Sequence, residues 1–257
     1  MEKGFEVFDL TGRTAIVTGG SRGIGFAIAK GLASAGATII LGDILIDQGE
    51  EAARAIRSGG FEARFIEVDV TQRSSIEEMV SKALKEFQTI HILVNNAGVI
   101  IRKPMMEITD QEWDWLMNVN LRGTFLCSQV IGKEMVKQRH GKVINISSNV
   151  AHTLQPDRGV YAVTKAAISH LTRAFALEWA PYHINVNAIA PGTTVTELNK
   201  RHFEEHPEDY RERVQTHPLG RLGEPKDYMG AAIFLASKAS DFMTGQTVFV
   251  DGGSTLI

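Results

Sequence analysis

The chain has 257 residues, of which 44% are hydrophobic and 22% charged, and its formal net charge is −3. This composition is typical of a globular protein with a substantial core, and no cluster of lysine and arginine resembles a nucleic-acid footprint. The single cysteine, Cys127, excludes an intrachain disulfide; without a visible secretory signal or an apolar run of membrane-spanning length, we expect a cytoplasmic protein that does not enter the membrane.

Short apolar runs, most of them β-branched, alternate with longer segments of helical spacing from one end of the chain to the other. Nearly continuous hydrophobicity is typical of strands that are covered on both faces. Alternation of this kind predicts an α/β fold of Rossmann type, a doubly wound parallel sheet of seven strands with helices on both faces. No linker or repeat divides the chain, so we expect one domain over residues 1–257. The expected strands lie at 14–19, 37–43, 63–70, 90–98, 141–147, 184–192 and 246–253.

The first of these strands runs directly into the glycine-rich sequence GGSRGIG at 19–25, which precedes a helix. Glycines permit a tight turn and let backbone N–H groups approach a pyrophosphate, next to the positive end of a helix dipole. The spacing is G-x3-G-x-G, which differs from the general dinucleotide fingerprint. Its position at the first strand–helix junction nevertheless predicts a dinucleotide site.

Asp43 ends the second expected strand, where a carboxylate accepts hydrogen bonds from the adenosine ribose. A carboxylate there also repels a 2′-phosphate and therefore favours NAD over NADP. Arg22 favours the opposite choice, because a guanidinium is a ready phosphate ligand. We give the larger weight to Asp43 and expect NAD, although a helix cap is the alternative role for its side chain.

Residues 193–224 are charged and histidine-rich, and they interrupt the alternation after the sixth expected strand. Long insertions in compact domains are typically lids or binding loops, and ligands bind at the carboxyl ends of such strands. We expect a substrate lid at about 193–224, with a solvated pair of surface helices as the alternative. The histidines of this segment share no ligand spacing with one another or with His152, so no metal site is expected.

Eight motifs follow one another over nearly the whole chain: TGGSRGIG (18–25), VDVT (68–71), NNAG (95–98), NVNLRG (118–123), NISS (145–148), YAVTK (161–165), NAIAPG (187–192) and VDGG (250–253). Together they resemble the short-chain dehydrogenase/reductase family. Its gluconate 5-dehydrogenase and 2-deoxy-D-gluconate 3-dehydrogenase group is the most similar, by the stretches NNAGVIIRKP (95–104), EWAPYHINVNAIAPG (178–192) and DYMGAAIFLASKASDFMTG (227–245). The resemblance implies an NAD(P)-dependent oxidoreductase that interconverts a secondary alcohol and a ketone, on a sugar acid or polyol. Together with the glycine-rich turn and Asp43, it gives the expected cofactor-binding set: Gly19, Ser21, Arg22, Gly23, Ile24, Gly25, Asp43, Asp69, Val70, Asn96, Ala97, Gly98, Tyr161, Lys165, Pro191, Gly192, Thr194 and Thr196.

The same resemblance makes Tyr161 the general acid/base and Lys165 its partner, with Ser148 binding the substrate oxygen and Asn120 a water that links Lys165 to solvent. A phenol with a reference pKa near 10 is ionised to about one part in a thousand at neutral pH. One ammonium about 5 Å away, at an effective dielectric of about 20, contributes on the order of 3 kcal/mol toward ionisation. The i, i+4 spacing of Tyr161 and Lys165 places both on one helix face, as this arrangement requires.

The substrate is less well specified by the sequence. Arg102 is a candidate ligand for a substrate carboxylate and His152 is a second candidate contact, whereas a solvated basic residue is the alternative for Arg102. The competing activity is an NADPH-dependent 3-oxoacyl-(acyl carrier protein) reductase, which shares most of the motifs. A dinucleotide-binding protein without turnover is the alternative from another class. Members of the family are commonly tetramers, so we expect a homotetramer built on the helices at about 110–138 and 160–180.

Overall fold

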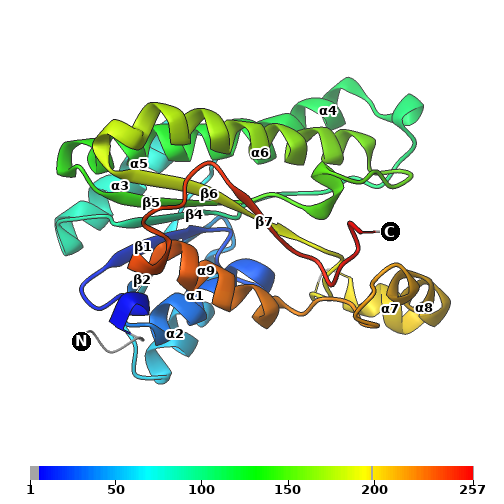
Figure 1. Cartoon of the computed structure of the whole chain (residues 1–257), viewed down its shortest axis with the longest axis horizontal. Coiled ribbons are helices and arrows are strands. Elements are labelled where there is room, and N and C mark those ends of the chain that lie inside the picture. Colours follow the sequence, from blue (N-terminus) through cyan, green and yellow to red (C-terminus); the bar gives the residue numbers. More distant parts are fainter. Residues whose placement is uncertain (1–5, 198, 257) are drawn as a thin grey trace.

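The computed structural model describes residues 6–197 and 199–256, and its centre is a parallel sheet of seven strands in the order β3-β2-β1-β4-β5-β6-β7 (Figure 1). Each strand coincides with one of the apolar runs, so the predicted sheet is confirmed. The order reverses between β1 and β4, which is where ligands bind in open sheets of this kind. The strands are β1 Thr14–Thr18, β2 Thr38–Asp43, β3 Ala63–Glu67, β4 Ile92–Asn95, β5 Gly141–Ile146, β6 Ile184–Pro191 and β7 Thr247–Val250.

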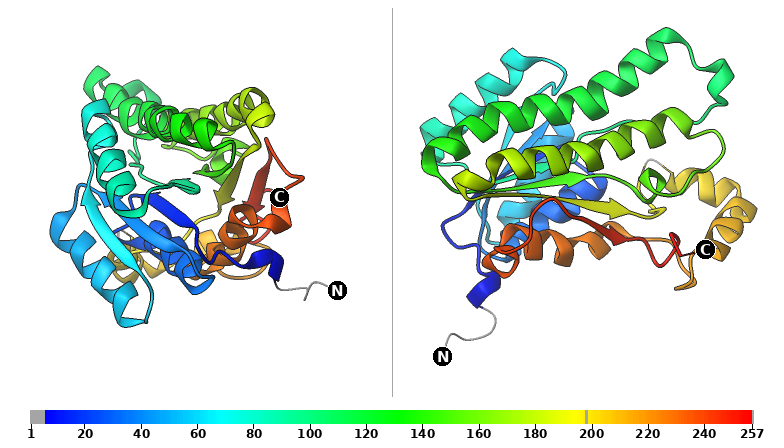
Figure 2. Two further views of the ribbon diagram at one scale, coloured as in Figure 1. Left: turned by 90° about the vertical axis from the view of Figure 1, so that its left-hand side faces the viewer. Right: turned by 45° about the horizontal axis from the view of Figure 1, so that its top comes forward.

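Helices cover both faces of the sheet, and Figure 2 shows the sheet between the two helical layers. One layer holds α1 (Gly23–Ser34), α2 (Ile46–Ser58) and α9 (Met229–Ala236), and the other holds α3 (Arg73–Phe87), α5 (Gly123–Gln138) and α6 (Gly159–Trp179) (Figure 1). The remaining helices are α4 (Asp110–Leu116), α7 (Lys200–Glu205) and α8 (Pro207–Gln215), with short turns η1 (Glu6–Phe8), η2 (Met105–Glu107), η3 (Met117–Arg122), η4 (Asn149–Ala151), η5 (Ala180–Tyr182), η6 (Pro225–Tyr228) and η7 (Lys238–Ser240).

Strand β1 shows why the runs are apolar without alternation. All five of its residues are buried, because successive side chains point into two separate cores. Ala15 and Val17 belong to the core beneath α1, α2 and α9, whereas Ile16 belongs to the core beneath α3 and α5. The two cores hold the central strands rigidly, so the loops at their carboxyl ends stand on a fixed base.

The helix between β4 and β5 differs from expectation. The sequence predicts one long helix at about 110–138, with a kink at Asn120 as the alternative role for that residue, but the chain forms α4, then the π-helical turn η3, then α5. π-Helical turns are rare and occur frequently at functional sites, because the wide turn changes the direction of one or two side chains. Here the turn carries Asn120 into the interior.

The segment 193–224 forms the helices α7 and α8, which lie beside the C-terminal part of the chain at one end of the molecule (Figure 1). The backbone N–H of Leu219 donates to the carbonyl oxygen of Gly252 at 3.1 Å, which ties the segment to the loop after β7. Leu198 of this segment lies outside the described residues. None of the helices in residues 6–197 and 199–256 has the length and apolar character of a membrane span.

Candidate active site

The glycine-rich turn after β1 packs against the loop that follows β4. Gly19 and Gly23 have positive φ values of 62° and 57°, which side-chain-bearing residues rarely adopt. At Gly25 a Cβ atom would collide with the carbonyl oxygen of Gly19 and the side-chain amide of Asn96. That amide donates hydrogen bonds to the carbonyl oxygens of Thr18, at 3.1 Å, and Gly19, at 2.8 Å. Asn96 thus fixes the shape of the turn from the neighbouring strand.

Asp43 lies beside this turn at the end of β2. One of its carboxylate oxygens accepts a hydrogen bond from the backbone N–H of Ser21, and the other accepts from Leu45, both at 3.2 Å. Arg22 is the exposed N-cap residue of α1 and makes no side-chain capping bond. The two groups with opposite implications for the cofactor therefore stand at the same corner of the site.

The other expected cofactor residues come to the same edge of the sheet. Asp69, after β3, accepts hydrogen bonds from the backbone N–H and the hydroxyl of Thr71 at 2.9 and 2.7 Å. Gly192, after β6, passes so close to the chain after β7 that a Cβ would lie 2.8 Å from the Cα of Asp251. Thr196 approaches the glycine-rich turn, because its Cγ2 would lie 3.7 Å from a Cβ at Gly23. The start of the 193–224 segment is thus next to the turn.

Asn120 joins three parts of the site from within the π-helical turn. Its side chain is fully buried, and its Oδ1 accepts a hydrogen bond from the backbone N–H of Val99 at 2.8 Å. Its Nδ2 donates to the carbonyl oxygen of Val99 at 2.9 Å and to the hydroxyl of Thr164 at 3.1 Å. A Cβ at Gly98 would lie 3.3 Å from that Oδ1 and 3.6 Å from Nζ of Lys165. Asn120 therefore holds the loop after β4 against α6, close to Lys165.

Tyr161 and Lys165 lie on one face of α6, as their spacing predicts. The ammonium of Lys165 is 5.6 Å from the centroid of the Tyr161 ring. Lys165 is buried, and its Nζ donates a hydrogen bond to the carbonyl oxygen of Ile146 at 2.8 Å, at the end of β5. This bond holds the lysine in place from the strand that leads to Ser148.

The two serines after β5 have different surroundings. The hydroxyl of Ser147 donates to the carbonyl oxygen of Lys165 at 2.9 Å and bonds the hydroxyl of Ser169 at 2.8 Å. The hydroxyl of Ser148 accepts a long bond from the N–H of Val150, at 3.3 Å, and lies close enough to Tyr161 to lower the pKa of its phenol by a hydrogen bond. Ser147 is committed to packing β5 against α6, which leaves Ser148 as the serine beside the tyrosine.

Burial dominates the pKa values of the Tyr–Lys pair in the protein alone. It raises the pKa of Tyr161, because a phenolate loses hydration there, and it lowers the pKa of Lys165 to about 8. The hydrogen bond from Ser148 and the charges of Arg158 and Arg102 lower the pKa of Tyr161 against this effect. From the sequence, the Lys165 ammonium is expected to be nearly sufficient to lower the pKa of the phenol, with an oxidised nicotinamide adding to it. That expectation does not include the desolvation of the phenol.

The two candidate substrate contacts occupy different places. Arg102 is exposed in the loop after β4, and its guanidinium and the phenol of Tyr161 are close enough to shift each other's pKa. His152 is exposed, and its ring centroid is 5.8 Å from that of Phe249 on β7. Arg158, which the motifs do not include, lies one turn before Tyr161 and is 9% exposed. Its position immediately before the YAVTK helix is the sequence signal that could have identified it.

These features fit a nicotinamide dinucleotide. In the turn at 19–25, Gly19 and Gly23 have positive φ values, and Gly25 lies too close to Gly19 and Asn96 for a side chain. Such a turn suits a phosphate bound by backbone N–H groups. The hydroxyl oxygen of Ser21 is buried and bonds to no group within the described part of the chain, which leaves it available to a ligand. Asp43 stands where a ribose would be held. When bound, the nicotinamide would accept or supply a hydride.

Comparisons with known proteins agree with this geometry. A family model described as enoyl-(acyl carrier protein) reductase matches residues 19–255. The 5-keto-D-gluconate 5-reductase of Escherichia coli K12 is 39% identical over 248 residues, 96% of this chain and 97% of that protein. The NAD-dependent glycerol dehydrogenase of Listeria innocua is 37% identical over 256 residues, 99% of this chain and 98% of that protein. A crystal structure of a Burkholderia cenocepacia gluconate 5-dehydrogenase with NADP and tartrate matches with a TM-score of 0.94 at 40% identity, covering 99% of this chain and 100% of that one.

The sequence resemblance is thereby confirmed, including its direction toward sugar-acid enzymes. The matches extend over nearly the whole chain, so they include the sheet, the glycine-rich turn and the helix of Tyr161 and Lys165 together. The chain therefore belongs to the short-chain dehydrogenase/reductase family, and it is an oxidoreductase that acts on an alcohol or ketone with a nicotinamide cofactor.

Proposed function

We propose that the protein interconverts a secondary alcohol and a ketone on a sugar acid or related polyol, with NAD(H), and that Tyr161 is the general acid/base. The observation that carries this proposal is the convergence of Tyr161, Ser148 and Lys165 at the carboxyl edge of the sheet, beside a turn that fits a dinucleotide. The sugar-acid and glycerol enzymes among its relatives support the substrate class.

In the direction of oxidation, the ionised oxygen of Tyr161 takes the proton of the substrate hydroxyl, and the C=O bond of the ketone forms. The hydrogen on the same carbon leaves with the electron pair of its C–H bond, as a hydride that a bound oxidised nicotinamide would accept. In reduction the phenol returns that proton to the ketone oxygen. The Ser148 hydroxyl donates a hydrogen bond to the same oxygen and holds it next to the phenol. The Lys165 ammonium stabilises the phenolate, and Asn120 is placed to hold a water beside Lys165. Such general acid–base catalysis contributes about 100- to 10,000-fold.

We expect NAD(H) to bind at least about tenfold more tightly than NADP(H), a difference of about 1.4 kcal/mol. The cause is Asp43, whose carboxylate would face the extra phosphate of NADP at the ribose. Fluorescence titration of NADH and NADPH measures both affinities. Asp43→Ser should reduce the preference at least about fivefold through tighter NADPH binding, whereas Asp47→Ser, which removes the same charge from an exposed position on α2, should not change it. Equal affinities in the unaltered protein would refute the role of Asp43.

The exposed Arg22 at the same corner favours a second candidate, an NADPH-dependent 3-oxoacyl-(acyl carrier protein) reductase. That activity requires tight NADPH binding and a thioester substrate. The titration above and a trial of acetoacetyl thioesters separate the two candidates. The sugar-acid names among the relatives support the first.

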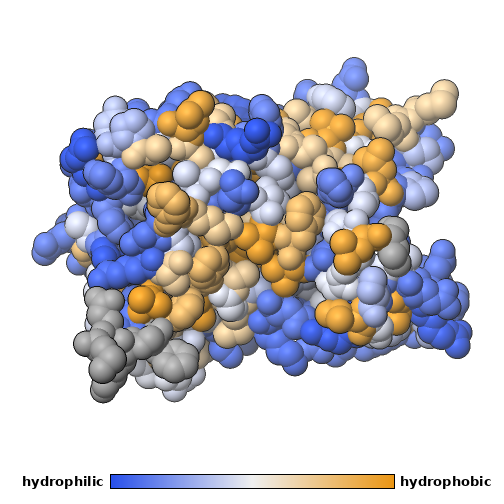
Figure 3. All heavy atoms as spheres, in the orientation of Figure 1, coloured by the Kyte–Doolittle hydropathy of each residue, from blue (hydrophilic) through white to orange (hydrophobic). Residues whose placement is uncertain are grey.

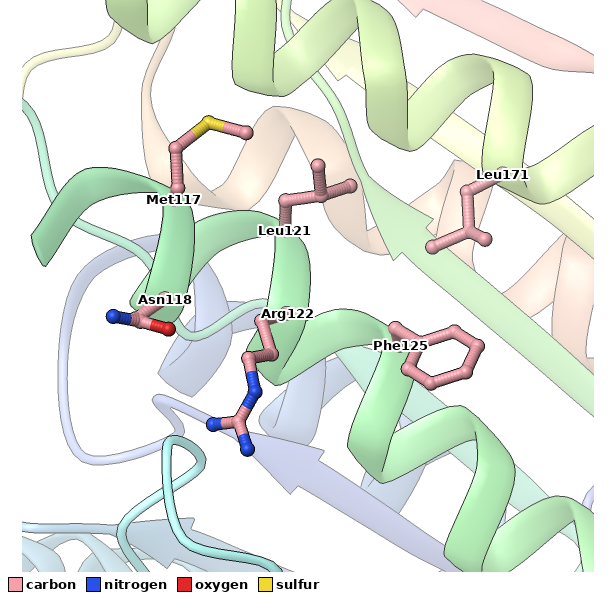
Figure 4. Close-up of a pocket in the computed structure, with 6 residues that line it drawn as sticks. All are labelled: Met117, Asn118, Leu121, Arg122, Phe125 and Leu171. Carbon is pink, nitrogen blue, oxygen red and sulfur yellow. The ribbon is translucent and has the colours of Figure 1, made fainter. Parts of the chain in front are cut away.

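We further propose that the protein is a homotetramer and acts in the cytoplasm. The single, buried cysteine suits a reducing compartment. For the assembly, an apolar groove of about 420 Å³ lies between η3, α5 and α6, where Leu121 and Phe125 face Leu171 (Figure 4). A second apolar band crosses the face shown in Figure 3. Phe249 on β7 and Phe242 in the loop before it are exposed apolar residues. We expect Leu171→Asp to dissociate the tetramer, because it would bury a charge, and light scattering before and after the change measures this.

A further inference from the structure

Arg158 is a buried cation without a partner. It is the N-cap residue of α6, the residue as a whole is 9% exposed, and its guanidinium makes no hydrogen bond or ion pair with any group in residues 6–197 and 199–256. Burying a guanidinium is costly unless an anion or acceptors compensate it. Tyr161 follows one helical turn later on the same helix, so this cation stands beside the reacting end of the site.

Two further arginines are brought to the same place by contacts between segments far apart in the sequence. The backbone N–H of Lys103 donates to the carbonyl oxygen of Asp157 at 2.8 Å, which joins the loop of Arg102 to the residue before Arg158. Arg213 of α8 donates a hydrogen bond to the side chain of Gln155 at 3.4 Å, which places the lid helix against the loop before α6. The cluster therefore has one guanidinium from each of three segments. Arg102 comes from the loop after β4, Arg158 from the start of α6 and Arg213 from α8.

No carboxylate neutralises this cluster. The ion pairs formed by the described residues include none of the three arginines. The pKa of Arg158 is lowered to about 10, first by burial and then by the charges of Arg213 and Arg102. The three cations therefore destabilise one another in the protein alone, and a bound anion would relieve both the repulsion and the unpaired burial.

We infer that Arg158 and Arg213, assisted by Arg102, form a binding site for the carboxylate of the substrate and make the enzyme selective for sugar acids over neutral polyols. This inference rests on the proposed function and narrows its substrate class. A guanidinium offers paired N–H donors that match the two oxygens of a carboxylate. Because Arg213 belongs to α8, the same anion that satisfies Arg158 also holds the lid over Tyr161, and a polyol of equal length gives neither contact.

The test compares D-gluconate with sorbitol, a neutral polyol of the same chain length, in steady-state kinetics with NAD. Loss of a charged hydrogen bond corresponds to about 10- to 100-fold. Arg213→Gln should raise the KM for gluconate at least about tenfold, while sorbitol kinetics stay within about twofold. Arg158→Leu should lower the ratio of kcat/KM for gluconate to kcat/KM for sorbitol at least about tenfold. Because the charge of Arg158 also lowers the pKa of Tyr161, this variant should slow sorbitol oxidation as well, and the ratio is the quantity compared. Arg158→Lys should recover only part of the loss, because it restores the charge but not the paired donors. Arg211→Gln, which removes an exposed arginine from the same helix, is the matched control and should leave both substrates unaffected.

Equal losses for gluconate and sorbitol, or no loss for either, would overturn the carboxylate site. NADH affinity and the thermal midpoint of each variant show whether it is folded. Protection by the anion gives a second readout: gluconate should raise the thermal midpoint of the unaltered protein but not that of Arg158→Leu. If gluconate raises the thermal midpoint only when Arg158 is present but is not turned over, the anion site is supported and the proposed function is rejected. If gluconate is turned over and neither arginine affects the rate, the proposed function is supported and the carboxylate site is rejected.

Discussion

Replacing Tyr161 by phenylalanine is expected to lower kcat at least about 1,000-fold, while the affinity for NADH stays within about threefold. The ring of Phe fills the same space on α6 beneath the Lys165 ammonium, so packing is retained. What is lost is the only phenol beside Ser148 among the described residues, and with it the group that exchanges the hydroxyl proton. Steady-state formation of reduced nicotinamide measures kcat, and fluorescence titration measures the affinity.

A matched control is available in Tyr182, a partly exposed tyrosine of the η5 turn at the far end of α6. Tyr182→Phe removes the same hydroxyl from a position remote from Ser148 and should leave kcat within about twofold. If Tyr161→Phe retained full turnover along with its cofactor affinity, Tyr161 would not be the general acid/base.

The sheet and the catalytic helix could be predicted because their signals are local. β-Branched runs such as TAIVT leave no polar face for solvent, so each predicts a strand buried on both sides. The spacing of Tyr161 and Lys165 fixes their common face once a helix forms, and the structure has them as expected. The glycine-rich turn could also be predicted from the sequence, and in the structure Gly25 has no room for a Cβ.

What could not be predicted depends on contacts between distant segments. The π-helical turn at η3 carries Asn120, whose side chain bonds both backbone groups of Val99, and no local pattern encodes that pairing. Arg158 and Arg213 are 55 residues apart in the sequence, and only the packing of α8 against the loop before α6 brings them together. The raised pKa of Tyr161 likewise follows from burial, which spacing alone does not reveal.

The most direct test of the proposed sugar-acid activity compares kcat/KM of the unaltered enzyme for a sugar acid and for a neutral polyol. A neutral substrate would leave the guanidinium groups of Arg158 and Arg102 beside Tyr161, and that of Arg213 near Arg158, without an anion. A site built around buried polar groups discriminates by a factor of about 10,000 or more against an analogue that leaves those groups unpaired. Because Arg102 is exposed and Arg213 only partly buried, we expect a smaller ratio here. With NAD, kcat/KM for D-gluconate or a related sugar acid should therefore exceed that for sorbitol at least about 100-fold. Equal values, or turnover of the polyols alone, would contradict it.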